Sequence, residues 1–349
     1  MITRMIKRQW ITGAICAISS AIVMLTGGAV RSQAQTITGA GSTFAFPAIA
    51  KWTPIYKHLH GININYQPIG SGAGISQYKA GTVDFGATDA PLSNSEMKRM
   101  PGPTLHIPIV AGAEVLSYNL PGVGAGLRLT GPIIADIFLG KIKSWNDPRI
   151  RKLNPYMKLP NLSIQVMHRS DASGTTFIFT HYLSAVSPAW ARQVGAGKSV
   201  SWPVGQGGPG NPGVTNLIRH APGGIGYIEL AYALQNHLPY GPIENRSGNF
   251  VLPTTANNQA ALSTGVARME KDIRSLVVNA PGINSYPIVG YSYALIAEYP
   301  KNKVKARETV NFLRWAVSEG QHYAAELKYV PMAPAVVHLA LENLNKVKD

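Results

Sequence analysis

The sequence is poor in cysteine and in acidic side chains. It contains one cysteine, Cys16, and 17 aspartate and glutamate residues against 32 lysine and arginine residues. A mature chain that loses the segment around Cys16 can form neither a disulfide framework nor a thiolate metal site. The shortage of acids gives a formal net charge of +15, which favours an anionic partner. It also predicts tolerance of acidic media, because few carboxylates change their charge on acidification.

A run of transmembrane length is missing near the N-terminus. The apolar run 11–25 covers about 15 residues, whereas a helix that crosses a bilayer needs roughly 20. Arg4, Lys7 and Arg8 precede this run, and small residues lead up to Ala34. The pattern predicts a secretory signal peptide that is cleaved after Ala34, and therefore a periplasmic protein.

Signatures of nucleic-acid binding and of phosphate-handling enzymes are also missing. No run of lysine and arginine is interleaved with aromatic residues, and an exported chain does not meet nucleic acid. No lysine follows a glycine-rich turn as in a P-loop, and neither Ser71 nor Ser173 lies in a G-x-S-x-G elbow. We therefore expect no nucleic-acid partner and no catalytic residue.

Two further motifs are present but incomplete. The stretch 202–213 contains the dinucleotide fingerprint G-x-G-x-x-G, but Pro209 and Pro212 oppose a helix there, which predicts a loop. His58 and His60 form an H-x-H pair without a third ligand nearby, which favours solvent-exposed histidines over a metal site. We expect no cofactor and no metal.

Short β-like runs alternate with helix-like runs along the rest of the chain, which predicts an α/β fold with largely parallel sheets. These runs are 62–67, 83–87, 164–167 and 225–228. About 300 residues is the length at which chains divide into two domains. Two β-rich segments, 107–114 and 286–294, are expected to cross between two such lobes. The resulting parts are a signal peptide at 1–34, lobe one at 35–109 plus 290–349, and lobe two at 110–289.

Three small, hydroxyl-bearing turns open directly into helix-like segments, at 39–43, 70–74 and 171–175. A helix N-terminus has unsatisfied N–H groups and a partial positive charge, and a serine or threonine there can donate its hydroxyl hydrogen to an anion. Glycine lets the backbone approach a ligand closely. Any one of these turns could be plain N-capping by serine or threonine, but three together predict an oxyanion cradle.

Charged side chains lie beside these turns. Arg169 lies just before the third turn, and Asp171 lies two residues after Arg169. This pairing suits either a guanidinium fork that a carboxylate holds on one side or an ordinary surface salt bridge. Asp89 follows a strand-like run, where α/β proteins gather their ligands. In that place a carboxylate could accept a hydrogen bond from protonated phosphate and repel sulfate. The alternative is that Asp89 caps the segment at Ser93.

At these residues the chain resembles the periplasmic phosphate-binding proteins of bacterial phosphate ABC transporters. The matching stretches are GAGSTFAFPAIAKW (39–52), NYQPIGSGAGISQYKAGTVDFGATDAPLS (65–93), IFLGKIKSWNDPRIRKLNP (137–155), HRSDASGTTFIFTHYL (168–183) and PGGIGYIELAYA (222–233). The resemblance spans nearly all of the mature chain. The sequence departs from the family's pattern at Gly72, where many relatives have serine, and at Ala172, where glycine is common.

The resemblance implies the class II periplasmic-binding-protein fold, in which two α/β lobes are joined by a two-segment hinge and the ligand cleft lies between them. In this sequence it implies phosphate ligands at Thr43, Phe44, Ser71, Asp89, Arg169, Ser173, Gly174 and Thr175. It also implies that Asp171 acts as the partner of Arg169.

The function that the resemblance implies is high-affinity binding of inorganic phosphate in the periplasm and delivery to an ABC-type phosphate importer. We expect a monomer that closes around phosphate by a hinge motion and is then recognised by an inner-membrane permease. Two alternatives stay open on the same fold, namely binding of another oxyanion and a secreted phosphatase-like enzyme. A scaffold or adhesion protein is a third class, which would not need the anion site.

Overall fold

The computed structural model describes residues 36–348. The predicted signal peptide and its cleavage site at Ala34 lie outside these residues. The strands are β1 (Thr36–Gly41), β2 (Asn63–Gln67), β3 (Phe85–Thr88), β4 (Thr104–Tyr118), β5 (Gln165–Arg169), β6 (Gln206–Gly208), β7 (Gly224–Glu229), β8 (Ile243–Glu244), β9 (Phe250–Val251) and β10 (Val289–Ala297). The four β-like runs in the sequence overlap β2, β3, β5 and β7, so these predictions are confirmed.

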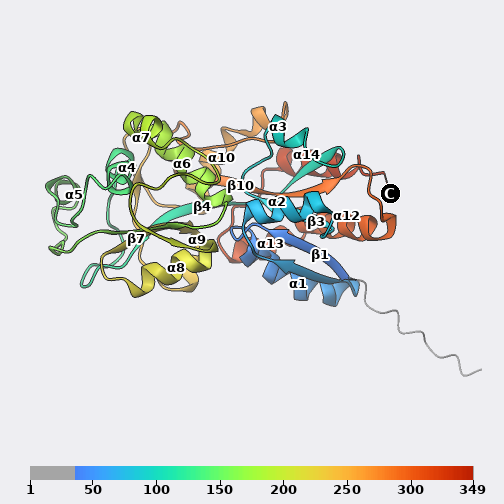
Figure 1. Ribbon diagram of the computed structural model, residues 1–349, viewed down its shortest axis with the longest axis horizontal. Coiled ribbons are helices and arrows are strands. Elements are labelled where there is room, and N and C mark those ends of the chain that lie inside the picture. The colour runs from blue at the N-terminus through green and yellow to red at the C-terminus, as the bar shows by residue number, and fades with distance from the viewer. Residues whose placement is uncertain (1–35, 349) are drawn as a thin grey trace, which may run out of the picture. The chain divides into compact units, whose positions relative to one another are not determined.

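Helices alternate with these strands along the chain, which confirms the α/β prediction (Figure 1). The first seven are α1 (Phe46–His60), α2 (Ser71–Ala80), α3 (Asn94–Met97), α4 (Gly131–Phe138), α5 (Pro148–Leu153), α6 (Gly174–Val186) and α7 (Pro188–Gln193). The others are α8 (Gly210–His220), α9 (Leu230–Gln235), α10 (Thr255–Ser263), α11 (Val266–Met269), α12 (Lys303–Val317), α13 (Gly320–Glu326) and α14 (Pro334–Leu344). Within residues 36–348, no helix combines the length and the apolar character needed to cross a membrane.

One eight-stranded sheet runs in the order β2-β1-β3-β10-β4-β7-β5-β6, and β8 and β9 form a separate two-stranded ribbon. The central strands β10 and β4 pair antiparallel. On one side β1 pairs in parallel with β2 and β3, and on the other β5 pairs in parallel with β6 and β7. The predicted crossing segments 107–114 and 286–294 overlap β4 and β10. The two halves of the sheet are thus joined through this central pair, while the lobe boundaries at 109 and 289 stay a prediction.

The loop predicted at 202–213 is wrong in part. This stretch contains β6, which pairs with β5, and α8 begins inside it at Gly210. Pro212 is compatible with the helix because it lies in the first turn, where a backbone N–H has no partner inside the helix. Gly210 has a φ of 65°, a left-handed conformation that suits glycine, and it turns the chain from β6 into α8.

Large aromatic side chains fill the interior on both sides of the central strands. Trp52, Trp145 and Trp190 are fully buried. Each indole N–H donates to a backbone carbonyl, at 2.6 Å to Gly320, 2.9 Å to Gly223 and 2.8 Å to Gly195, respectively. A buried indole N–H without an acceptor would be destabilising, and these three bonds satisfy it at each position.

Candidate anion-binding site

The three predicted turns lie where a strand ends and a helix begins. Turn 39–43 contains the end of β1, turn 70–74 contains the start of α2, and turn 171–175 leads from β5 into α6. The backbone N–H of Gly70 donates to Gly41 O at 2.8 Å, and a Cβ placed on Gly74 would lie 2.3 Å from the Cα of Gly41. Only glycine therefore lets the second turn pack onto the first. The first N–H groups of α2 and α6 have no backbone partner inside their helices, and those that donate to no other group of the protein can bind an anion.

The turns from the two sides of the sheet also contact each other. A Cβ placed on Gly174 would lie 2.5 Å from Asp89 Oδ2 and 2.6 Å from Ser71 Oγ, so a larger residue at 174 would push these groups apart. The N–H of Gly72 donates to the carbonyl of Ala172 at 2.8 Å. A Cβ on Gly72 would meet the methyl group of Ala172 at 2.4 Å. The two departures from the family's pattern thus face each other, and the missing side chain at Gly72 makes room for Ala172.

Asp89 lies inside this contact and is 3% exposed. Ser42 Oγ donates a short hydrogen bond to Asp89 Oδ1, and the Asp89 N–H donates to Ser71 Oγ at 3.3 Å. Burial raises the pKa of Asp89 to about 6, although the hydrogen bond from Ser42 and the charge of Arg169 oppose this shift. The capping alternative for Asp89 is wrong, because α3 is capped by Ser93, whose Oγ accepts from Glu96 N–H at 3.2 Å.

Arg169 is the buried cation of the site, with a side chain that is 1% exposed. Its Nε and Nη2 donate to Asp171 Oδ1 and Oδ2 at 2.7 and 2.6 Å, and its Nη1 donates to Thr175 Oγ1 at 3.0 Å. Burial raises the pKa of Asp171, but the hydrogen bonds and charge of Arg169 outweigh it and hold the pKa below its usual value. The pair is therefore a buried guanidinium fork and not a surface salt bridge.

The remaining predicted ligands lie at the same place. Thr43, Phe44, Ser173 and Thr175 are all at most 2% exposed. The carbonyl of Thr43 accepts from Tyr232 Oη at 2.6 Å, and that of Phe44 accepts from Tyr329 Oη at 2.5 Å, so two tyrosines fix the first turn. Ser173 differs from the others, because its Oγ already accepts from the N–H of Thr176 at 3.0 Å as the cap of α6. Its hydroxyl hydrogen remains available for an anion.

Asn211 is a polar residue of this site that the sequence did not reveal. It is fully buried at the start of α8, and its Nδ2 donates to Thr43 Oγ1 at 3.0 Å and to Thr175 Oγ1 at 3.1 Å. The sequence predicts a loop at 202–213, so it does not indicate that Asn211 lies on a helix whose start faces the turns. The one usable signal is the glycine pattern before it, which also matches a dinucleotide fingerprint.

Two buried acids were also missed. Glu114 and Glu229 are fully buried, and burial raises the pKa of each well above its usual value. Among the described residues, neither oxygen of Glu114 has a hydrogen-bond partner, and Glu229 Oε1 has none. Burial disfavours the ionised form of a carboxylate that lacks a full set of hydrogen bonds, so both side chains favour the neutral form.

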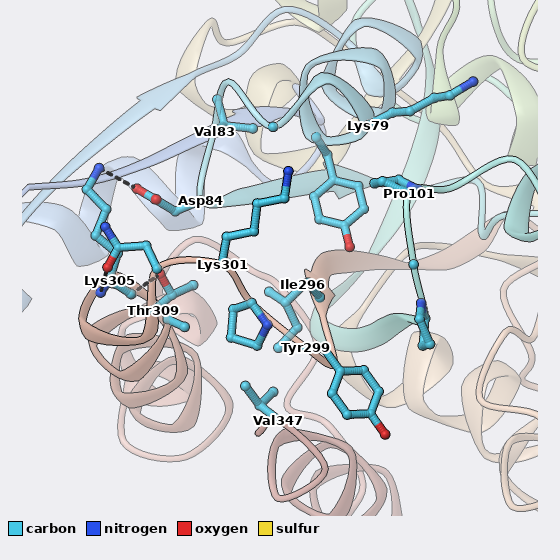
Figure 2. Close-up of a pocket in the computed structure, with 18 of the residues that line it drawn as sticks. Lys79, Val83, Asp84, Pro101, Ile296, Tyr299, Lys301, Lys305, Thr309 and Val347 are labelled. Carbon is cyan, nitrogen blue, oxygen red and sulfur yellow. Dashed lines mark hydrogen bonds and ion pairs between the residues drawn. The ribbon is translucent and has the colours of Figure 1, made fainter. Parts of the chain in front are cut away.

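A cavity of about 540 Å³ lies elsewhere, among the ends of α2 and β10 and the first turns of α12 (Figure 2). At its edge Lys305 Nζ and Asp84 Oδ2 form an ion pair at 3.2 Å. None of the predicted phosphate ligands lines it. His58 and His60 are exposed, and residues 36–348 contain no cluster of three or more His, Cys, Asp or Glu side chains placed to hold a metal ion.

The fold and the convergent turns agree with a comparison to known families. A model described as a PBP superfamily domain matches residues 27–320, and the chain belongs to this superfamily.

Individual curated relatives are similar to the chain over most of its length. The chain is 43% identical over 88% of its length to the phosphate-binding protein PstS of Xylella fastidiosa strain Temecula1, of which it covers 85%. It is 44% identical over 90% of its length to the phosphate-binding protein PstS of Haemophilus influenzae, of which it covers 94%. A solved structure of a high-affinity periplasmic phosphate-binding protein bound with phosphate has the same fold, with a TM-score of 0.68 at 17% identity. The superposition covers 89% of this chain and 98% of that one.

Proposed function

We propose that the protein binds inorganic phosphate in the periplasm and delivers it to an ABC-type phosphate importer. The observation that carries this proposal is the convergence of three glycine-rich turns, the Arg169 fork and a single buried acceptor, Asp89. Relatives with 43% and 44% identity are named phosphate-binding proteins, which supports the same ligand and supports a receptor over an enzyme. The ligands of the proposed site are Thr43, Phe44, Ser71, Asp89, Arg169, Ser173, Gly174 and Thr175.

The composition of this site suits phosphate better than sulfate. Hydroxyl, backbone N–H and guanidinium groups all donate hydrogen bonds, and they suit the ionised oxygens of either anion. The Asp89 carboxylate can only accept, and it needs a hydrogen on the ligand. Phosphate carries such a hydrogen at neutral pH, whereas sulfate does not, so sulfate meets repulsion at Asp89.

Hinge closure explains why the ligands come from both sides of the central strands. Ser71 and Asp89 belong to proposed lobe one (35–109 plus 290–349), and Arg169 and Gly174 to proposed lobe two (110–289). The hydrogen bond from Gly72 N–H to Ala172 O and the ion pair of Glu96 with Lys198 at 2.5 Å link the same two sides. Phosphate held by donors from both lobes would favour the closed state, which an inner-membrane permease then recognises in a monomeric receptor.

Calorimetric titration of the chain from residue 35 onwards tests this function. We expect one phosphate per monomer with a dissociation constant in the micromolar range or below, competition by arsenate, and no detectable heat with sulfate at the same concentration. Equal affinity for sulfate would indicate a general oxyanion receptor, and no heat with phosphate would refute the proposal. Release of phosphate from an ester substrate would favour the enzyme alternative.

A further inference from the structure

Asn211 contacts two hydroxyl groups that belong to opposite sides of the site. Its backbone N–H and its Nδ2 donate to Thr43 Oγ1, at 3.1 and 3.0 Å, and its Nδ2 also donates to Thr175 Oγ1 at 3.1 Å. Both hydrogens of the side-chain amide are therefore used. Thr43 follows β1 and Thr175 lies in the first turn of α6, so one amide group connects the first and third turns.

The orientation of this amide follows from the third hydrogen bond of the side chain. The N–H of Glu229 donates to Asn211 Oδ1 at 2.9 Å. Because a backbone N–H can only donate, the atom facing it must be the oxygen of the amide, and the nitrogen must face the two threonines. The asparagine thus acts as a donor toward both hydroxyl groups.

These bonds determine what each hydroxyl can do. A hydroxyl oxygen accepts two hydrogen bonds and donates one. Thr43 Oγ1 accepts from the backbone N–H and from the Nδ2 of Asn211, and Thr175 Oγ1 accepts from Asn211 Nδ2 and from Arg169 Nη1 at 3.0 Å. Neither oxygen has a remaining lone pair for a ligand. Each hydroxyl hydrogen can therefore only donate, and no acceptor among the described residues takes it.

We infer that Asn211 is a positioning residue for the anion site, which fixes the hydroxyl groups of Thr43 and Thr175 as hydrogen-bond donors to the bound ligand. The inference rests on the proposed phosphate function. It adds a residue outside the predicted ligand set, which holds both threonines in the donor role that the proposed site requires. Asn211 itself need not touch phosphate.

A double-mutant cycle tests this role. In the wild-type background, we expect Asn211→Leu to weaken phosphate binding about tenfold or more, because two hydrogen bonds to a charged ligand lose their fixed direction. In a Thr43→Val/Thr175→Val background the hydroxyls are absent, and the same substitution should change the dissociation constant less than about twofold. Equal losses in both backgrounds would show that Asn211 acts only through general stability and would overturn the inference.

Two further variants keep the test decisive. Asn211→Asp has the same size and keeps an acceptor for the Glu229 N–H, but it presents an acceptor to both threonines, and we expect a larger loss of affinity than with Asn211→Leu. Wild-type affinity in Asn211→Asp would contradict the inference even if the leucine variant did not fold. Asn258→Leu is the matched control, since Asn258 is fully buried on α10 and its Nδ2 donates to Pro253 O, and phosphate affinity should not change.

Titration of the wild-type chain comes first in this series. Binding of phosphate by the wild type together with equal losses in both backgrounds would refute the role of Asn211 and leave the proposed function intact. Absence of phosphate binding by the wild type would refute the proposed function, and the role of Asn211 with it.

Discussion

Glu114 and Glu229 are directly paired residues on the neighbouring strands β4 and β7, and both are fully buried. Glu229 Oε2 accepts from the N–H of Ala231 at 2.8 Å, but neither carboxyl oxygen of Glu114 has a partner among the described residues. Both acids lie close enough to Asp89 for its charge to raise their pKa further, in addition to burial. A neutral pair of acids therefore lies next to the anion site, where two more negative charges would oppose phosphate binding.

The stability of the protein should fall as the pH rises above about 4.5. A carboxyl whose pKa is higher in the folded than in the unfolded state contributes stability that is full below the unfolded pKa and is lost as pH rises through the folded pKa. Asp89, Glu114 and Glu229 all have raised pKa values, from 3.8 to about 6 for Asp89 and from 4.5 upwards for the glutamates. Urea unfolding should show a net decrease in the free energy of unfolding between pH 4.5 and 8, because these three acids outnumber His106, whose pKa is lowered to about 4 and which therefore acts in the opposite direction.

Glu114→Gln provides the comparison for this profile. The amide cannot ionise, so the variant should lose less stability between pH 4.5 and 8 than the wild type does. Glu270→Gln, at an exposed position, should leave the profile unchanged. A wild-type free energy of unfolding that rises across this range would contradict the assignment of neutral buried acids. The expected profile agrees with the acid tolerance that the low acid content predicts.

Asp89→Asn should change selectivity more than affinity for phosphate. The amide is neutral, so sulfate no longer meets a buried carboxylate, while phosphate keeps its donors from the turns and from Arg169. We expect sulfate binding to become measurable and phosphate binding to weaken by about tenfold or less, because the amide oxygen still accepts the hydrogen of phosphate but is a weaker acceptor than a carboxylate oxygen. Competition calorimetry measures both, and unchanged discrimination would refute the role of Asp89.

Gly174→Ala should block closure without unfolding the protein. The added methyl group would lie 2.5 Å from Asp89 Oδ2 and 2.6 Å from Ser71 Oγ, so the two sides of the site could not approach as they do here. We expect phosphate affinity to fall by about a hundredfold, or about 2.7 kcal/mol, with little change in the melting temperature of the phosphate-free protein. Gly102→Ala is the control, because nothing lies within 4 Å of a Cβ there. Wild-type affinity in Gly174→Ala would show that close contact at this glycine is not needed.

Lys198→Ala should weaken the closed state slightly. Lys198 Nζ of proposed lobe two contacts Glu96 Oε1 of proposed lobe one at 2.5 Å, and the two side chains are 22% and 21% exposed. A partly exposed ion pair contributes about 0.5–1 kcal/mol, so we expect phosphate to dissociate about two- to fivefold faster, with a smaller difference at high salt. Lys51→Ala, which removes an exposed pair with Glu326, should leave the rate unchanged in stopped-flow measurements. A phosphate dissociation rate that is unchanged in Lys198→Ala would show that the ion pair with Glu96 does not stabilise the closed state.

Local chemistry explains the parts of the site that the sequence predicted. Arg169 and Asp171 are two residues apart, and their ion pair forms within one turn of chain. The glycines at 41, 70 and 74 indicate that the backbone lies close to neighbouring segments, because a side chain at these positions would clash with their atoms. Such signals depend on short stretches of sequence, so they can indicate these turns without knowledge of the packing.

The parts that the sequence did not predict depend on long-range packing. Asn211 lies 168 residues from Thr43, and nothing in the sequence near either residue indicates that they are hydrogen-bonded. Pro212 misled the prediction because proline breaks the interior of a helix but fits its first turn. Glu114 and Glu229 look like ordinary surface acids in sequence, since their burial follows only from the pairing of β4 with β7.

A crystal structure of the protein grown with phosphate tests the central claim most directly. We predict one tetrahedral anion enclosed by the three turns, within hydrogen-bond distance of Thr43, Ser71, Asp89, Arg169 and Thr175. Phosphate bound elsewhere, for example in the cavity beside Lys305, with the three turns unoccupied, would contradict the account.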